Sequence, residues 1–286
     1  MEYVRLGRTN LKVSKIGFGG APVGIKNYLA VHDPSKKDDT KPIIEAIHKA
    51  IECGINFFDT APAYGDGQGE KIFGEAFQAI DPEKICVATK IGINDIDNVR
   101  GSVESSLKRL KRDSIDLIQI HGEHILDEDA DFILKDGGTL DEMYRLKEEG
   151  LVKFIGFTSE DQDPPMHRMI QSNRFDVLQT CYNFIFQHPC DPVRKSGSLY
   201  EAKELDMGTI TMRSATSMIF QKWIQKVNPN NTFDYTEALI QFVLSNFLVD
   251  VVLIGMRNTE EVMLNIELLK NTSGRIDLDD LHKRIV

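Results

Sequence analysis

The chain has few of the residues that hold small secreted proteins together. Its 286 residues include one tryptophan and four cysteines, which are Cys53, Cys86, Cys181 and Cys190. The cysteines form no C-x-x-C pair, and the first three lie in apolar segments. We therefore expect buried, reduced thiols rather than disulfides or a zinc site. A chain of this length can bury a core without either.

Long apolar runs and excess positive charge are also missing. No segment approaches the roughly eighteen uncharged apolar residues of a membrane helix, and the opening MEYVRLGRTN is too polar for a secretory signal. We expect a cytoplasmic protein that does not bind a membrane. The formal net charge of −10 disfavours a nucleic-acid-binding surface. The expected partner is a small molecule, and the sequence does not indicate an oligomeric state.

Two common nucleotide-binding motifs are absent. The segment Gly17-Phe-Gly-Gly lacks the third glycine of a Rossmann fingerprint at the required spacing. The segment Gly65-Asp-Gly-Gln-Gly lacks the Lys-Ser/Thr that a phosphate-binding loop requires, and is interpreted as a flexible turn.

Short apolar runs rich in Val, Ile and Phe alternate along the chain with longer segments of helical spacing. This pattern is typical of βα units whose strands are buried on both faces. Eight strands, enough to close a barrel, are expected at residues 16–19, 56–59, 85–89, 115–120, 154–157, 177–180, 209–212 and 251–254. Helices are expected at residues 41–53, 99–110, 139–149, 236–246 and 259–269.

Glycines separate the expected helices from the strands that follow. Gly54, Gly150 and Gly208 each end a helical run, where a left-handed backbone is easiest for glycine. Residues 3–13 predict a small hairpin before the first barrel strand. No linker, repeat or low-complexity stretch is visible. The predicted fold is α/β, a single (β/α)8 TIM barrel domain over residues 1–286 with a short N-terminal β-hairpin.

Ionisable residues stand at the ends of three successive expected strands. Asp59 ends the second strand, with Tyr64 in the following turn, whereas Lys90 and His121 follow the third and fourth. Each alone would be interpreted as a loop residue or a helix cap. Together at the carboxyl ends of barrel strands they predict a proton-transfer site. Lys90, held by Asp59, would favour ionisation of the Tyr64 phenol, and His121 would orient a carbonyl oxygen.

The chain resembles the aldo-keto reductase family over nearly its whole length. The strand-end order of Asp59, Tyr64, Lys90 and His121 is similar to that family's catalytic tetrad. The segments that carry the resemblance are RLGRT from residue 5, GINFFDTAPAYG from 54, ATK from 88, DLIQIH from 116 and KFIGFTS from 153. The resemblance implies a (β/α)8 barrel that reversibly reduces an aldehyde, ketone or aldose carbonyl, with hydride from NAD(P)H and a proton from Tyr64.

Cofactor positions are carried over from the family one by one. Ser159 and Gln179 match contacts to the nicotinamide carboxamide, and residues 255–265 match the adenosine-phosphate segment at a helix amino end. The complete set that the resemblance implies is Gly19, Gly20, Asp59, Ser159, Gln179, Met212, Arg213, Ser214, Gly255, Arg257, Glu261 and Asn265.

NADP(H) is the expected cofactor, with NAD(H) as the alternative. Arg257 is suited to a ribose 2′-phosphate, because a guanidinium binds phosphate with two parallel hydrogen bonds. Glu261, one helical turn later, would repel that phosphate and accept from a free 2′-hydroxyl instead. The resemblance to a mostly NADP-using family decides for NADP(H).

The sequence departs from the family pattern at several positions. Glu160 stands where Asn or Arg is usual, and Met212 where an aromatic ring stacks on the nicotinamide. Leu264 replaces a Glu that meets the adenine, and Gly122 replaces an aromatic substrate wall. Residue type alone favours core packing for Met212 and Leu264. Gly122 predicts a roomier and more polar pocket.

Two other functions stay open. Some aldo-keto-reductase-like proteins, such as potassium-channel β-subunits, act mainly as cofactor-binding regulatory subunits. A metal-dependent barrel hydrolase would use Asp59, His121 and His124 around an activated water. No further His or Cys follows a neighbouring strand, so no metal ligands are assigned.

The substrate is not indicated by the sequence. It depends on polar loops expected at residues 26–41, 122–138 and 214–231, whose conformations cannot be derived from sequence. Trp223, in the third of these loops, is interpreted either as a pocket lid or as a cover for the barrel.

Overall fold

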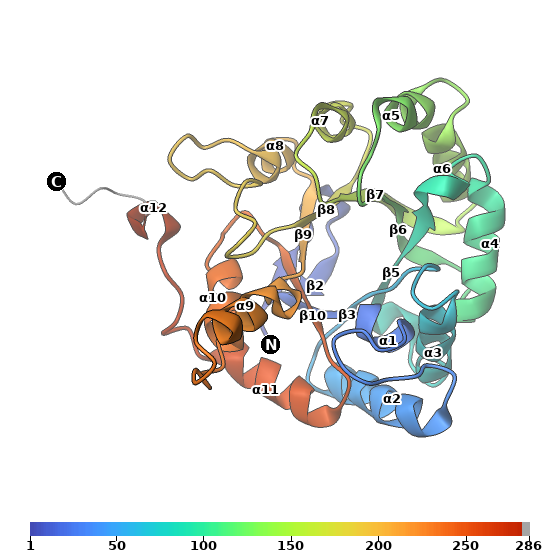
Figure 1. Ribbon diagram of the computed structural model, residues 1–286. Helices are drawn as coiled ribbons and strands as arrows, with labels where there is room; N and C mark the ends of the chain where they lie inside the picture. The colour runs from blue at the N-terminus through green and yellow to red at the C-terminus, as the bar shows by residue number, and fades with distance from the viewer. Residues whose placement is uncertain (282–286) are drawn as a thin grey trace.

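Eight parallel strands close into a barrel in the computed structural model, which describes residues 1–281 (Figure 1). Each strand pairs with the next in the chain, and the last pairs with both the first and the seventh. All eight strands and the (β/α)8 class predicted from the sequence are confirmed. The strands are β3 (Ile16–Gly19), β4 (Phe57–Asp59), β5 (Cys86–Gly92), β6 (Ile115–His121), β7 (Val152–Ser159), β8 (Val177–Cys181), β9 (Gly208–Met212) and β10 (Val251–Gly255).

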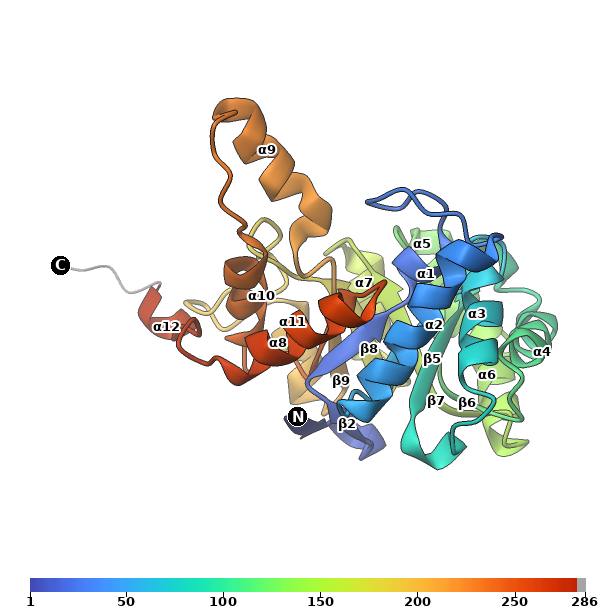
Figure 2. The ribbon, with the colours of Figure 1, turned by 90° about the horizontal axis from the view of Figure 1, so that it is seen from below.

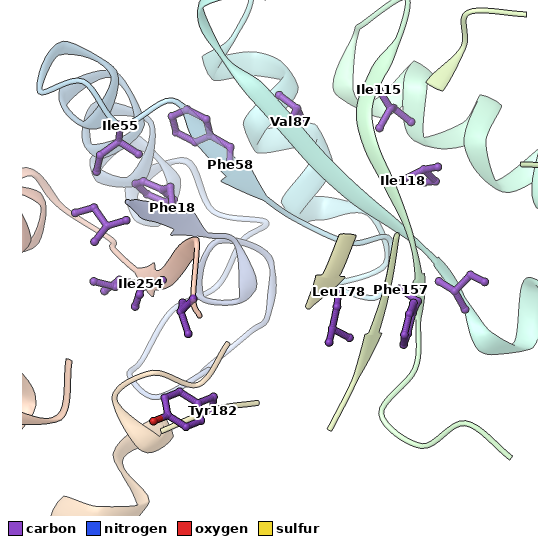
Figure 3. Packing of buried hydrophobic residues seen from close by; sticks show 14 of the residues in the cluster. Phe18, Ile55, Phe58, Val87, Ile115, Ile118, Phe157, Leu178, Tyr182 and Ile254 are labelled. Carbon is purple, nitrogen blue, oxygen red and sulfur yellow. The ribbon is translucent and has the colours of Figure 1, made fainter. Parts of the chain in front are cut away.

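Side chains alternate along each strand between the barrel interior and the surrounding helices, as the pleat requires. In β4, Phe57 belongs to the interior cluster, whereas Phe58 packs outward against Phe18, with ring centroids 5.8 Å apart. Figure 3 shows part of this outer layer. The same alternation turns Lys90, two residues beyond the interior Ala88, toward the barrel axis.

Helices surround the strands in Figure 1. The five helices expected from the sequence are confirmed, with small differences at their ends. The α-helices are α1 (Ala21–Gly24), α2 (Lys37–Glu52), α3 (Gln68–Ala76), α4 (Val99–Leu110), α5 (Asp127–Leu134), α6 (Thr139–Glu148), α7 (Pro164–Gln171), α8 (Ser198–Glu204), α9 (Ile219–Val227), α10 (Thr236–Leu244), α11 (Thr259–Lys270) and α12 (Leu278–Leu281). Short 3-10 turns are η1 (Gly7–Thr9), η2 (Pro82–Lys84), η3 (Ile93–Asp95) and η4 (Thr216–Met218).

The three segments expected as polar loops contain helices. Residues 26–41 include the start of α2, whose first turn carries Asp38 and Asp39. Residues 122–138 contain α5, which also opens on acidic residues and buries Ala130 and Ile133. Acidic side chains stabilise a helix amino end, so charge that suggested a loop instead supports a helix in both places. Residues 214–231 contain η4 and α9.

Helix α9 projects away from the barrel, as Figure 2 shows. Trp223 lies on this helix with 58 % of its surface exposed, and its ring centroid is 6.2 Å from that of Phe220. The interpretation of Trp223 as a cover packed on the barrel is therefore wrong.

The predicted N-terminal hairpin is confirmed. Strands β1 (Tyr3–Arg5) and β2 (Lys12–Ser14) pair antiparallel on either side of η1. Leu6 and Val13 join the cluster inside the barrel, so the hairpin closes the end at which the strands begin. Figure 2 shows it at the end opposite to α9.

None of the helices within residues 1–281 is long and apolar enough to span a bilayer.

Gly7 is required where the hairpin meets β9. Its φ is +45°, and a Cβ there would lie 2.1 Å from the backbone nitrogen of Gly208. We predict that Gly7→Ala destabilises the fold by about 2 kcal/mol or more beyond the ~1–2 kcal/mol of a left-handed alanine, because the backbone must also move. Chemical denaturation followed by circular dichroism measures this loss.

Gly137 is the matched control, since its φ is +71° and nothing lies within 4 Å of its Cβ position. Gly137→Ala isolates the conformational cost alone. Equal losses in the two variants would show that the hairpin does not press on β9 as described.

Candidate active site

A buried ion pair joins the ends of β4 and β5. The Lys90 ammonium donates to both carboxylate oxygens of Asp59 at 2.7 and 2.8 Å, and to the Thr60 carbonyl at 2.8 Å. Lys90 and Asp59 are 1 % and 2 % exposed. Burial raises the pKa of Asp59 and lowers the pKa of Lys90, and the opposite charge of the partner opposes each shift. Three oxygen acceptors around one nitrogen fit a charged ammonium.

Tyr64 lies in a tight turn between β4 and α3. The turn is closed by backbone bonds from Gly67 to the Pro62 carbonyl at 2.7 Å and from Gly69 to the Tyr64 carbonyl at 3.1 Å. Gly65 and Gly67 have φ of +67° and +81°, which explains the glycines that the sequence places here. The turn holds the Tyr64 ring with its centroid 5.1 Å from the Lys90 nitrogen.

His121, at the end of β6, faces the same ring. The centroids of Tyr64 and His121 are 5.9 Å apart and the rings are nearly perpendicular, at 85°. Burial and the nearby Lys90 charge lower the pKa of His121 to about 3. The imidazole is therefore neutral near pH 7. A neutral ring keeps one N–H that can donate to a carbonyl oxygen.

The pKa of Tyr64 does not move in the direction expected from the sequence. Burial, and then the Asp59 charge, raise the pKa of this phenol well above its usual value. Arg213 acts in the opposite direction, but its positive charge does not outweigh burial and Asp59. Tyr64 is thus a protonated phenol that can give up its proton only as negative charge develops next to it.

The buried side-chain amides of Gln119 and Gln179 complete the site. Gln179 was predicted from the sequence, whereas Gln119 was not. Gln119 donates to Gln179 at 3.0 Å and weakly to Asp59 at 3.4 Å. Its own carbonyl oxygen is buried without a partner among residues 1–281. Strand periodicity could have found Gln119, because it precedes His121 by two residues and so shares its face of β6.

Residues 15–233 match the model of the Aldo/keto reductase family. The chain belongs to this family. The match covers more than half of its 286 residues, and the family membership predicted from the sequence is confirmed.

Several curated relatives are oxidoreductases by name. L-galactose dehydrogenase of Arabidopsis thaliana is 36 % identical over 169 residues, covering 55 % of this chain and 48 % of that protein. The chain thus matches about half the length of this relative. An uncharacterized oxidoreductase of Bacillus subtilis is 26 % identical over 300 residues, covering 93 % and 90 %. The NADH-specific methylglyoxal reductase of Escherichia coli is 28 % identical over 207 residues, covering 65 % and 60 %.

Solved aldo-keto reductases share the fold. The holo form of one from Bacillus halodurans superposes with a TM-score of 0.74 at 22 % identity, covering 95 % of this chain and 92 % of that one. One from Klebsiella pneumoniae, in complex with NADPH, gives 0.71 at 17 % identity, covering 98 % and 92 %. Because the sequence identities are this low, the structural similarity shows that the fold is shared and no more.

In this aldo-keto reductase, Arg257 and Glu261 contact each other at the start of α11. The carboxylate accepts from the Arg257 backbone nitrogen at 2.8 Å and faces its guanidinium at 3.4 Å. Asn258 caps the helix by accepting from the Glu261 nitrogen at 2.8 Å, and Asn265 donates to the Glu261 carbonyl. One guanidinium nitrogen, Nη1 of Arg257, is buried without a partner within residues 1–281.

A second ion pair lies near the ends of β7 and β9. Arg213 and Glu160 are 2.5 Å apart and both are partly buried. Arg213 lowers and Glu160 raises the pKa of the Tyr64 phenol, less strongly than burial and Asp59 do. Ser159 is buried and its hydroxyl exchanges hydrogen bonds with the Asp161 backbone at 3.2 and 3.4 Å. Ser214 is also buried and donates to the Leu253 carbonyl at 3.1 Å.

The glycines assigned to the cofactor lie at adjacent strand ends. Gly19 of β3 is paired in register with Gly255 of β10. A Cβ on Gly20 would lie 2.4 Å from the Asp59 carbonyl oxygen, and one on Gly255 would lie 2.5 Å from Pro22. Glycine at these two positions is therefore explained by close packing of the chain itself.

The departures from the family pattern agree with expectation at Met212 but not at Leu264 or Gly122. Leu264 is 64 % exposed, so its assignment to the core is wrong. Met212 is partly buried against the interior cluster, as residue type suggested. Gly122 is buried, and a Cβ there would lie 2.7 Å from Ile125, so the space that an aromatic side chain would need is filled by Ile125.

His124 does not join His121. It is largely exposed and pairs with Asp161, whose hydrogen bond and charge raise the pKa of the imidazole. In the part of the chain that the structure describes, no three His, Cys, Asp or Glu side chains are grouped to hold a metal ion. The geometry thus gives the hydrolase alternative no support.

The two histidines provide a test of the site's electrostatics. We predict that His121 stays neutral as the pH is lowered toward 3, because burial disfavours its cation, whereas His124 takes up a proton at a pH above its usual pKa of about 6.5. An NMR titration of the histidine rings, assigned with His121→Asn and His124→Asn, measures both. Titration of His121 near pH 6 to 7 would contradict the description of this site.

Proposed function

We propose that this aldo-keto reductase transfers hydride between NADP(H) and the carbonyl group of an aldehyde, ketone or aldose. The observation that carries the proposal is the meeting of a protonated Tyr64, a neutral His121 and the buried Lys90–Asp59 pair at the strand ends. The three parts supply a proton donor, a hydrogen-bond donor and a fixed charge. A carbonyl oxygen that gains negative charge during hydride transfer is stabilised by these three groups.

The residues present fit a nicotinamide dinucleotide. Arg257, whose Nη1 has no partner in the described part of the chain, lies at the amino end of α11 and would hold a phosphate of the adenosine part. Gln179 and the carbonyl of Gln119, which has no partner within residues 1–281, offer amide groups to a nicotinamide carboxamide. The bound nicotinamide would supply the hydride that reaches the carbonyl carbon.

The chain's own residues then act on the carbonyl oxygen. His121 donates an N–H to it, which orients the carbonyl and stabilises developing negative charge. The O–H bond of Tyr64 breaks and its proton passes to the oxygen, which gives the alcohol. The tyrosinate left behind faces the Lys90 ammonium, whose attraction stabilises it until the proton is replaced.

The relatives support an oxidoreductase but differ in the cofactor that their names state. The Escherichia coli relative is specific for NADH, and the Klebsiella pneumoniae structure contains NADPH. The Arg257 guanidinium supports the choice of NADP(H), which Glu261 opposes. A panel of aldehydes, ketones and aldoses, followed by NADPH and NADH absorbance, tests the activity and finds the substrate class.

We predict that Tyr64→Phe lowers kcat by ~10²- to 10⁴-fold, the range expected when a general acid is removed. Binding of NADPH should change little, since the ring is retained. Steady-state kinetics and isothermal titration calorimetry with NADPH measure the two effects.

Tyr144→Phe is the control, because it removes a hydroxyl that donates to the Arg174 carbonyl at 2.6 Å, on α6 and away from the site. It should retain normal turnover. Normal turnover of Tyr64→Phe itself would remove this residue from the mechanism.

For the cofactor, we predict that Arg257→Ala weakens NADPH binding roughly ten- to a hundredfold more than NADH binding. Glu261→Gln should strengthen NADPH binding, because the carboxylate occupies the guanidinium and repels a 2′-phosphate. Dissociation constants for both cofactors measure the preference.

Lys270→Ala, which removes a more exposed ion pair with Glu267 at the other end of α11, should leave both constants unchanged. Equal losses for NADPH and NADH in Arg257→Ala would show that Arg257 does not distinguish the 2′-phosphate.

A further inference from the structure

A second buried carboxylate lies behind the catalytic candidates. Glu70, in the first turn of α3, is 0 % exposed. One oxygen accepts from the Thr89 hydroxyl at 2.6 Å, and the other accepts from Arg109 Nε at 2.5 Å. A carboxylate in this position is costly to bury, and each of its oxygens is satisfied by one partner from a different element.

Each hydrogen-bond partner of Glu70 lies next to a residue of the proposed mechanism: Thr89 next to Lys90, and Arg109 next to the Tyr64 turn. Thr89 immediately precedes Lys90 on β5, so its hydrogen bond fixes the strand on which the lysine stands. Arg109, on α4, packs against the turn that carries Tyr64. A Cβ on Gly67 would lie 2.5 Å from Arg109 Cδ and 2.8 Å from its Nε.

Glu70 itself lies in the helix that directly follows the Tyr64 turn. The α3 helix begins at Gln68, and the Gly69 nitrogen donates to the Tyr64 carbonyl at 3.1 Å. The carboxylate therefore connects the Tyr64 turn, the Lys90 strand and α4 through a single buried side chain. A shift of Glu70 would change the distance between Tyr64 and Lys90.

We propose that Glu70 is a positioning residue, which aligns the Tyr64 turn with Lys90 through Thr89 and Arg109. The proposal rests on the proposed carbonyl reduction. Glu70 also adds negative charge near Lys90 and so supports its ammonium form. The titratable groups around Lys90 are then Asp59 from β4, Tyr64 from the turn, His121 from β6 and Glu70 from α3.

The first test is Glu70→Gln, which keeps the size of the side chain and an acceptor for Thr89 but removes the charge that holds Arg109. We expect kcat to fall by roughly ten- to a hundredfold, the effect of a small misplacement of catalytic groups, with little change in NADPH affinity. Glu70→Asp keeps the charge on a shorter side chain. Compared with Glu70→Gln, it should recover part of the wild-type pH dependence of kcat but not the full kcat.

Asp116→Asn is the matched control. Asp116 is a buried carboxylate held by Arg112 at 3.0 Å and Lys153 at 2.9 Å, but it lies at the far end of β6 from His121. Its loss should lower the melting temperature without a comparable fall in kcat. A fall in kcat that merely tracks stability in both variants would reduce Glu70 to a structural clamp and overturn the proposal.

A readout without turnover separates this inference from the proposed function. With lysine labelled at Cε, the NMR signal missing in Lys90→Met reports the titration of Lys90. Glu70→Gln should move that titration to lower pH, because a nearby negative charge is gone, and Asp116→Asn should not. Unchanged Lys90 titration together with unchanged kcat refutes the role of Glu70.

If the wild-type protein reduces no carbonyl, the proposed function fails while the titration still tests the link from Glu70 to Lys90. Should Glu70→Gln not fold, Thr89→Val takes its place, since it removes only the 2.6 Å hydrogen bond and leaves the Glu70–Arg109 pair. It should lower kcat without moving the Lys90 titration. A normal kcat in Thr89→Val would also overturn the proposal.

Discussion

The buried pair of Lys90 and Asp59 is the constraint around which the mouth of the barrel is organised. Two opposite charges removed from water contribute little net stability, whereas removal of one partner costs about 3–5 kcal/mol, because the other is left uncompensated. The pair is thus better explained by the charge that it places at the strand ends than by stability. Its geometry also fixes β4 against β5, since Lys90 bonds to both the carboxylate and the next carbonyl along the chain.

The protonation states nearby follow from this pair and from burial. Lys90 disfavours a second cation, so His121 stays neutral, and Asp59 disfavours a second anion, so Tyr64 keeps its proton. The Tyr64 hydroxyl and the His121 N–H therefore both remain hydrogen-bond donors on neighbouring rings. The fold produces this arrangement with ordinary strand alternation, because Asp59, Lys90 and His121 are all interior positions.

Much of the barrel and of the candidate site could be predicted because the signals are local. Apolar runs mark the strands, and a polar residue at the end of such a run falls at the carboxyl end of the barrel, as Asp59, Lys90 and His121 do. The direction of the Tyr64 pKa shift could not be predicted, since it depends on how deeply the ring is buried and on how strongly the Asp59 charge acts on it. Glu70 was missed for a similar reason. Nothing near it in sequence shows that Arg109 lies across from it.

Helix α9 has a consequence for how the protein can be observed. The chain's one tryptophan, Trp223, is on this projecting helix with more than half of its surface in solvent. Intrinsic tryptophan emission therefore reports the environment of α9 and not the packing of the barrel. A change in that emission would follow movement of α9, so a structural change confined to the barrel has to be followed by another signal.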